Sequence, residues 1–331
     1  MEEMHPNRDT AIDVSRGIAA LLMIIGHLKL NNEVDQFIFS FHMPLFFILS
    51  GMTVHEEKEF FPYLKKRIRR LLVPYFIFAL IFAEPEITNW SKCFFGTREG
   101  LLNAGSLSPL WFLPCLFSAD VIFHLLLKFC REEKVLIIVS LLLAAVGIII
   151  RRFLPFGIAL PFSIDIAMVS IPFLLIGYLL KRHSEFMNKA KDNLVAGIIV
   201  AVGLVIILLF TYSRNLPPSA VDGIYHVEMA TGCYGNIFWF YFNSIIGSFA
   251  VILFSLLMAG KLKVMERFGN CTITCLVSHW SILSLMNRIG AVINVNPVLF
   301  HVITVIVTVI AVFGIHHVLE SYAPNLIGKT G

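Results

Sequence analysis

The chain has 331 residues, of which 57% are hydrophobic and only 15% are charged, whereas a soluble domain carries about a quarter charged residues. The formal net charge of +4 is too small for a nucleic-acid-binding surface. The charges lie between apolar runs of about 20 residues, the length that crosses a hydrocarbon core of roughly 30 Å. The composition therefore excludes a secreted soluble enzyme, a Rossmann domain and a disordered scaffold, and it indicates a polytopic membrane protein.

The apolar runs predict an all-α integral membrane fold with about ten transmembrane helices. We expect residues 1–331 to form a single transmembrane domain without an appended soluble domain. The predicted spans cover residues 11–30, 34–54, 71–88, 109–130, 135–150, 158–180, 194–211, 237–259, 271–290 and 298–320.

The distribution of Lys and Arg predicts the orientation. With the N-terminus inside the cell, interior segments hold 18 of these residues and exterior segments hold 7, which places both termini in the cytoplasm. Arg151 and Arg152 are the largest exception to this bias. The long exterior loops, about 84–108 and 212–236, are rich in Gly, Pro, Asn and aromatic residues. They are candidates for a lid or a binding surface.

The first span carries three ionisable residues, which are costly in lipid and are therefore functional candidates. At about 100° per residue, Asp13, Arg16 and His27 share one helical face, which must point into the protein. Asp13 and Arg16 can neutralise each other, since they stand three residues apart. Arg16 and His27 are about 16 Å apart along the axis, so they serve different parts of one elongated ligand, or only one is functional. The alternative is a polar ladder that only holds the bundle together.

Two further segments carry candidates. The interior segment 55–74 contains Arg67 and Arg70 among six basic residues. Guanidinium groups bind phosphate bidentately, so this segment predicts a site for a nucleotide-like anion, and the alternative is an anchor that contacts lipid head groups. In the second span, His42 precedes Pro44, and Pro44 and Gly51 indicate a broken helix that lines a cavity.

The remaining polar residues and the cysteines give weaker signals. For Asp120, His124 and His279, a hydrogen-bonded core residue is the simpler interpretation. No C-x-x-C pair occurs among the six cysteines, so we expect no structural zinc and no bound metal. Cys93 and Cys233 both lie in predicted exterior loops, and either form a disulfide in an oxidising compartment or are two unrelated thiols.

Several motifs together resemble the acyltransferase-3 family of membrane O-acyltransferases, and most closely its sugar O-acetylase-like branch. Asp13-x-x-Arg16-Gly17 with an R-x10-H spacing resembles the family's first span. Thr272, Cys275 and Leu276 depart from the Ser–Tyr pattern that the family's ninth span usually shows. The other matching strings are FFILSG at 46–51, KRIRRLLVPY at 66–75, LWFLP at 110–114 and FGNCTITCLVSH at 268–279.

The resemblance implies an enzyme of the bacterial inner membrane that transfers an acyl group, usually acetyl, from cytosolic acyl-CoA to a hydroxyl of a cell-envelope or exported glycan. It implies a catalytic group of His27, Arg16 and Asp13, with His27 as general base. It implies substrate-binding roles for Arg67, Arg70, His42, Trp111 and His279. Acetyl-CoA is then a co-substrate, a glycan or lipid-linked saccharide is the acceptor, and membrane lipid surrounds the protein.

Two other functions are compatible with the same residues. In a transporter or flippase for a lipid-linked sugar, His27, Arg16 and Asp13 form a polar pathway; this predicts an inverted repeat, which the sequence does not show. In a non-catalytic membrane subunit, replacing His27 by alanine has no effect on function.

Overall fold

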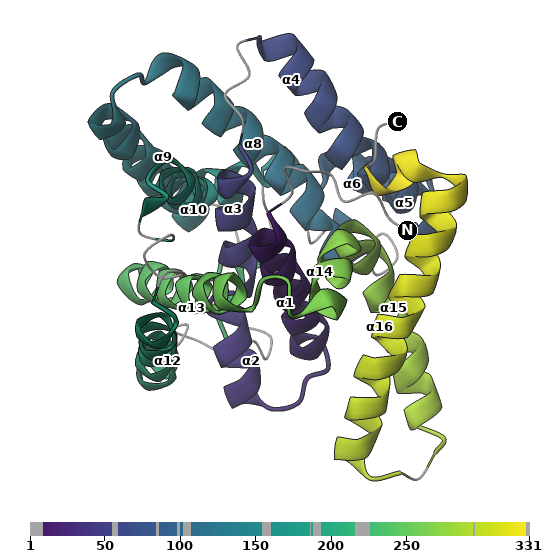
Figure 1. Ribbon diagram of the computed structural model, residues 1–331. Helices are drawn as coiled ribbons and strands as arrows, with labels where there is room; N and C mark the ends of the chain where they lie inside the picture. The colour runs from purple at the N-terminus through teal and green to yellow at the C-terminus, as the bar shows by residue number, and fades with distance from the viewer. Residues whose placement is uncertain are drawn as a thin grey trace.

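Helices form almost all of the computed structural model, and no strand occurs in the part of the chain it describes, only an isolated bridge between Glu228 and Cys233 (Figure 1). The described residues are 9–54, 59–83, 86–97, 100–101, 107–153, 160–185, 187, 193–215, 226–293 and 295–328. The α-helices are α1 (Thr10–Gly26), α2 (Asn32–Phe39), α3 (His42–Met52), α4 (Phe60–Arg67), α5 (Val73–Phe82), α6 (Ile87–Phe95), α8 (Phe112–Phe129), α9 (Glu133–Phe153), α10 (Ile164–Arg182), α12 (Leu194–Thr211), α13 (Ile237–Met258), α14 (Lys263–Asn270), α15 (Thr272–Gly290) and α16 (Pro297–Tyr322). Short helical segments are η1 (Ile68–Leu72, a π-helix), η2 (Ser108–Trp111), η3 (Pro161–Ser163), η4 (Tyr212–Arg214), η6 (Met229–Thr231) and η7 (Pro324–Ile327).

The prediction of an all-α membrane protein is confirmed. Among the described residues, seven helical segments are long and apolar enough to cross a membrane, and they match seven of the ten predicted spans. The other three differ for identifiable reasons. Helix α1 has 17 residues and contains Asp13 and Arg16, α5 has 10 residues and stops at Phe82, and α15 contains polar residues such as His279 and Arg288.

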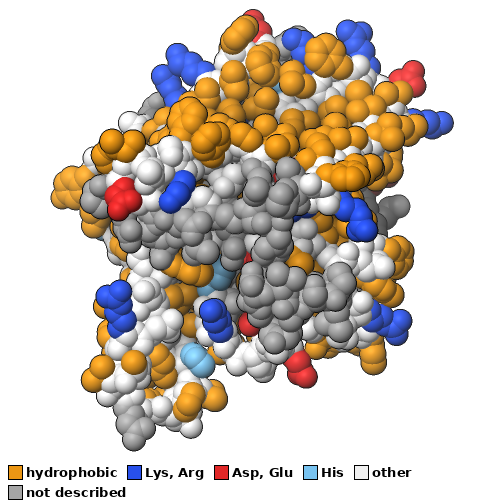
Figure 2. All heavy atoms as spheres, turned by 180° about the vertical axis from the view of Figure 1, so that it is seen from behind, with side chains coloured by type: hydrophobic (Ala, Val, Ile, Leu, Met, Phe, Trp, Pro, Cys, Tyr) orange, Lys and Arg blue, Asp and Glu red, His pale blue; other side chains and the backbone are white. Residues whose placement is uncertain are grey.

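Helix α1 lies at the centre of the bundle and contacts α3, α13, α14 and α15. Helices α9 and α12 lie toward one edge, and α15 and α16 form a hairpin at the opposite edge (Figure 1). Most side chains of α9, α12 and α16 are not buried within the bundle, and Figure 2 shows hydrophobic side chains over much of one face. These peripheral helices therefore present the apolar surface that a bilayer requires.

The predicted exterior loops contain more structure than expected. Helix α6 forms inside the first loop, where the Tyr75 hydroxyl donates a hydrogen bond to the carbonyl of Cys93. Residues 84–85, 98–99, 102–106 and 216–225 of these two loops lie outside the described residues.

Arg151, an exception in the charge count, lies inside the protein. It forms an ion pair with Asp165 of α10 at 4.0 Å, and both side chains are buried. Gly232, with φ +68°, packs directly on the Arg151 side chain, and a Cβ at this position would overlap it. The charge of Arg151 is thus compensated within the protein. Arg151 therefore gives no information on which side of the membrane this segment lies.

Helices α3 and α10 approach closely through two glycines. A Cβ on Gly177 would overlap the carbonyl oxygen of Ile48, and one on Gly51 would overlap that of Leu174. We therefore expect Gly177→Ala to lower the free energy of unfolding by about 1–3 kcal/mol, because neither backbone oxygen can move aside. Thermal unfolding in detergent measures this effect. Gly203→Ala in α12, where a Cβ meets open space, is the control, and equal Tm values for the two variants would contradict the prediction.

Candidate functional site

A cavity of about 460 Å³ lies between α1, α3, α8 and the basic segment around Arg67. Among the described residues, its cationic lining consists of Arg16 from α1, Lys66 and Arg67 from α4, and Arg70 from η1. The other lining residues are Met23, Met43, Phe46, Ser50, Thr53, Leu71, Phe112, Leu113, Leu116, Gly269, Asn270, Thr272, Ile273, Leu276, Ile327 and Gly328. The cavity follows α3 from Thr53 to Met43, about 15 Å of helix, so it suits an elongated ligand with one anionic end.

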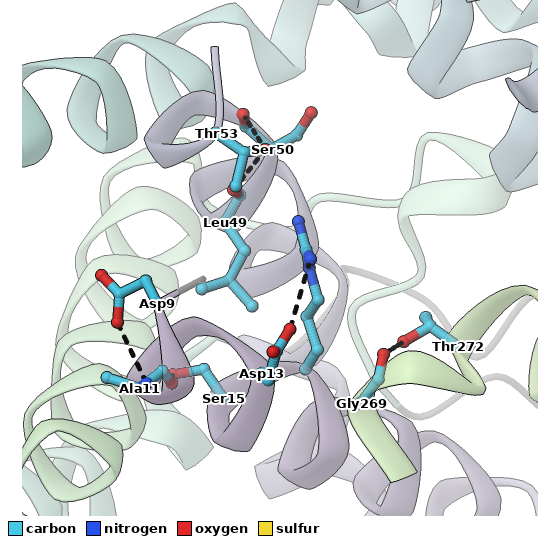
Figure 3. Close-up of polar contacts among 10 residues, drawn as sticks. Asp9, Ala11, Asp13, Ser15, Leu49, Ser50, Thr53, Gly269 and Thr272 are labelled. Carbon is cyan, nitrogen blue, oxygen red and sulfur yellow. Dashed lines mark hydrogen bonds and ion pairs between the residues drawn. The ribbon is translucent and has the colours of Figure 1, made fainter. Parts of the chain in front are cut away.

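The Arg16 side chain is held by its own helix. It forms an ion pair with Asp13 at 3.7 Å, which confirms that these two residues neutralise each other. Asp13 is buried, and the Arg16 side chain is 32% exposed and lines the cavity. Helix α14 lies directly on this part of α1, because Gly17 and Gly269 leave no room for a Cβ between the backbones. Figure 3 shows the ion pair of Asp13 on α1, together with the contact of Ser50 with Thr53 at the end of α3 and that of Gly269 of α14 with Thr272.

Arg67 is held by a buried network that joins three helices. Its Nη1 lies 3.3 Å from the Oδ2 atom of Asp120 in α8, and its Nε donates to the hydroxyl of Tyr63 at 3.2 Å. The Tyr63 hydroxyl donates to the backbone carbonyl of Asp120 at 3.0 Å, and Ser50 of α3 donates to Asp120 Oδ1 at 2.9 Å. The ring of Tyr63 stacks on His124 at 4.0 Å. Arg67 is therefore both a cavity cation and half of an inter-helix ion pair.

Arg70 lies in the π-helical turn η1, a type of helix distortion that is frequent at functional sites. Arg70 forms no ion pair with a described carboxylate, and it is accessible at the mouth of the cavity. The end of the chain covers this turn: Gly328, with φ +71°, packs against the backbone of Arg70 and also lines the cavity. Among the described residues, Arg70 is thus the cavity arginine that no carboxylate pairs with directly, although the charge of Asp120 still acts on it.

His27 lies at the other end of α1, as its C-cap residue. Its imidazole stacks on that of His279 with ring centroids 5.3 Å apart, and it meets Trp280 edge-on at 5.1 Å and Phe39 at 5.8 Å. His279 is fully buried; its Nδ1 lies 2.7 Å from the carbonyl oxygen of Cys275, and its Nε2 has no hydrogen-bond partner among the described residues. Two imidazoles from α1 and α15 therefore share one aromatic environment.

His42 lies near the same group. The helix breaks at Ser40–Phe41, three residues before Pro44, so the predicted break in this span is confirmed there, whereas Gly51 lies inside α3. The Nδ1 atom of His42 is 3.0 Å from the carbonyl oxygen of Ile38, and its ring meets Phe39 at 4.8 Å. Phe39 also contacts His226 at 4.1 Å. We call His27, His42, His226 and His279 the histidine cluster.

The cavity and the histidine cluster are neighbours along the helices. Met23 lines the cavity one turn before His27, Met43 follows His42, and Leu276 stands three residues before His279. Trp111 is buried in η2, which contacts α15, but it is not among the cavity-lining residues, whereas the adjacent Phe112 is. Of the predicted site residues, the structure brings Arg16, Arg67 and Arg70 together, and separately His27, His42 and His279.

No group of three or more His, Cys, Asp or Glu side chains in the described ranges is arranged to hold a metal ion. All six cysteines are free thiols, so the disulfide considered between Cys93 and Cys233 does not form. Burial raises the pKa of both thiols, which keeps them protonated and unreactive.

Sequence reasoning missed four residues near the site. Asp120 was assigned to the core, although a carboxylate within an apolar span was a signal for a cationic partner. Ser50, Trp280 and His226 gave no individual signal, because each acquires its role through a partner on another segment.

Comparison with known proteins gives two findings. A family model described as an acyltransferase domain matches residues 9–317, nearly the whole chain. A curated relative is the nodulation protein NolL of Sinorhizobium fredii (strain NBRC 101917 / NGR234), which is 24% identical over 195 residues, covering 54% of this chain and 50% of NolL. The chain thus matches about half the length of this relative.

Proposed function

Because this chain belongs to the acyltransferase-3 family and is a multi-pass membrane acyltransferase, we propose that it transfers an acetyl group from cytosolic acetyl-CoA to a hydroxyl of a cell-envelope or exported glycan. The observation that carries the proposal is the cavity, in which Arg16, Arg67 and Arg70 converge at one end and whose other end lies one helical turn from His27. We place the enzyme in the bacterial inner membrane with both termini in the cytoplasm; the bacterial source of its relative and the bias of basic residues support this placement.

The donor fits the cavity by charge and by length. The phosphate groups of CoA bind at the arginines, since guanidinium groups form bidentate, charge-assisted hydrogen bonds with phosphate. The pantetheine arm follows α1 inward from Arg16 past Met23. The offset of about 16 Å between Arg16 and His27 then matches the separation of the phosphates from the thioester.

His27 acts as general base. A sugar hydroxyl is a poor nucleophile, and a neutral imidazole removes its proton as the oxygen forms a bond with the thioester carbonyl carbon. The C–S bond then breaks, and the sulfur takes the proton from His27 and leaves as CoA–SH. The stacked ring of His279, with Trp280 and Phe39, holds the His27 imidazole between aromatic surfaces, and Trp280 and His226 provide contacts for the acceptor sugar.

The experiment is acyl transfer in isolated membranes. Membranes from cells that express the protein, supplied with radiolabelled acetyl-CoA, should transfer label to a glycan fraction, and membranes without the protein should not. Mass spectrometry of that fraction should show one acetyl increment per labelled site. Labelled acetyl-CoA that is neither consumed nor transferred would point to the transporter or the non-catalytic subunit instead.

A further inference from the structure

Asp120 is a fully buried carboxylate in the middle of a helix bundle. Burying a charged group there costs free energy. Its side chain is 0% exposed, and the charge that faces it comes from Arg67 on another helix. Desolvating an ion pair costs several kcal/mol per ion, and similar packing is obtained more easily with apolar residues. A buried ion pair whose arginine lines a binding cavity therefore suggests a function beyond stability.

The geometry of the Arg67–Asp120 pair allows another anion to replace Asp120 as the partner of Arg67. Oδ1 of Asp120 accepts a hydrogen bond from Ser50, but Oδ2 meets Arg67 at 3.3 Å without forming a hydrogen bond, and no other described residue donates to it. Arg67 thus gives Asp120 one contact, not the two parallel bonds of a fork. A phosphate in the cavity can bind the Arg67 guanidinium through two parallel hydrogen bonds.

Two of the arginines that line the cavity are each paired with an aspartate of the protein. Arg16 is paired with Asp13 at 3.7 Å and Arg67 with Asp120 at 3.3 Å, whereas no carboxylate in the described part of the chain forms such a pair with Arg70. Two of the three cavity arginines therefore carry an internal anion when the cavity is empty. The Asp120 pair crosses between helices α8 and α4, so it also fixes where Arg67 stands.

We propose that Asp120 is the resident counterion of Arg67 and competes with the phosphate groups of CoA, so that CoA binds reversibly and leaves after transfer. The inference rests on acyl-CoA being the donor. Asp120 is a positioning residue: it acts on CoA chiefly through Arg67, its direct ion-pair partner, and more weakly through the charge of Arg70. When CoA binds, one of its phosphates replaces the Asp120 carboxylate as the partner of the Arg67 guanidinium. When CoA leaves, the Arg67–Asp120 ion pair forms again.

The test is the affinity of CoA for the full-length protein in detergent micelles. Asp120→Asn keeps the shape and the Ser50 contact but removes the carboxylate charge that competes with phosphate for Arg67. We expect CoA to bind about tenfold more tightly to this variant, chiefly through slower dissociation. We also expect CoA to raise the Tm of the variant more than that of the wild type, because CoA then supplies the missing anion.

Two comparisons separate this role from structural damage. Asp165→Asn removes a carboxylate from the other buried ion pair, the one with Arg151; it should lower Tm but leave CoA affinity unchanged. In an Arg67→Gln background, Asp120→Asn should change CoA affinity much less than in the wild type, because its direct ion-pair partner is gone and only the weaker interaction with Arg70 remains.

The outcomes are distinct. Absence of CoA binding to the wild type would reject acyl-CoA as the donor. Wild-type binding with equal or weaker binding to Asp120→Asn would reject the counterion role alone. If Asp120→Asn can be purified only in the presence of CoA, the role is supported, and if saturating CoA does not permit its recovery, phosphate cannot replace the carboxylate and the proposal is wrong.

Discussion

Replacing His27 by alanine should reduce acyl transfer by about 10²–10⁴-fold, the usual contribution of a general base, without loss of the protein from the membrane. His27 caps α1 and is only half-buried, so its removal costs the ring contacts with Phe39, His279 and Trp280 but leaves helix α1 itself in place. The loss should appear in turnover, while CoA affinity stays unchanged, because the phosphate-binding arginines lie about 16 Å away along the helix.

The control is His317→Ala, a histidine on the exposed face of α16, which should retain wild-type transfer. Labelled acetyl transfer to glycan in membranes, normalised to protein amount, measures both variants. A His27→Ala protein with activity within a few-fold of the wild type would show that another group accepts the proton.

The second large effect is expected at Arg70. Arg70→Ala should weaken CoA binding by about tenfold or more, since a hydrogen bond to a charged group is worth about 1.5–3 kcal/mol and 1.4 kcal/mol corresponds to a factor of ten. Arg70→Lys should restore only part of the affinity, because an ammonium group lacks the planar fork. The effect should exceed that of Arg67→Ala, because Arg67 is already shared with Asp120.

Arg69→Ala is a matched control. Arg69 neighbours Arg70 in η1 and is exposed, but it does not line the cavity. Titration of CoA into each variant measures the affinities, and the salt dependence of binding should decrease in Arg70→Ala only. Equal affinities for the wild type and Arg70→Ala would return this basic segment to the lipid-anchor interpretation.

Residue spacing and apolar runs in the sequence predicted the features that arise within a single helix. The i, i+3 spacing of Asp13 and Arg16 correctly gave their ion pair, and the apolar runs gave the membrane class. The break near His42 was also correct, since it follows from local backbone chemistry. The family resemblance implied a substrate-binding role for Arg67 and Arg70 but did not bring Arg16 to them, because no periodicity in the chain relates residue 16 to residue 70.

Contacts between distant helices could not be predicted. Helical periodicity gives the face on which a residue lies but not the partner of that face. His27 therefore gave no indication of His279, and Asp120 gave none of Arg67. Arg151 misled the charge count for the same reason: its neutralising partner, Asp165, lies on another helix.

The proposed function takes acetyl-CoA from the cytosol and passes its acetyl group to a cell-envelope or exported glycan, so we propose that donor and acceptor reach one site from opposite faces of the membrane. The most direct measurement compares inverted and right-side-out membrane vesicles, each given external radiolabelled acetyl-CoA, which is too highly charged to cross a bilayer. Inverted vesicles expose the cytosolic face, so label should reach glycan in them and not in intact right-side-out vesicles, and His27→Ala should abolish the signal. Label transfer in sealed right-side-out vesicles would contradict the account, because the basic cavity would then open to the exterior.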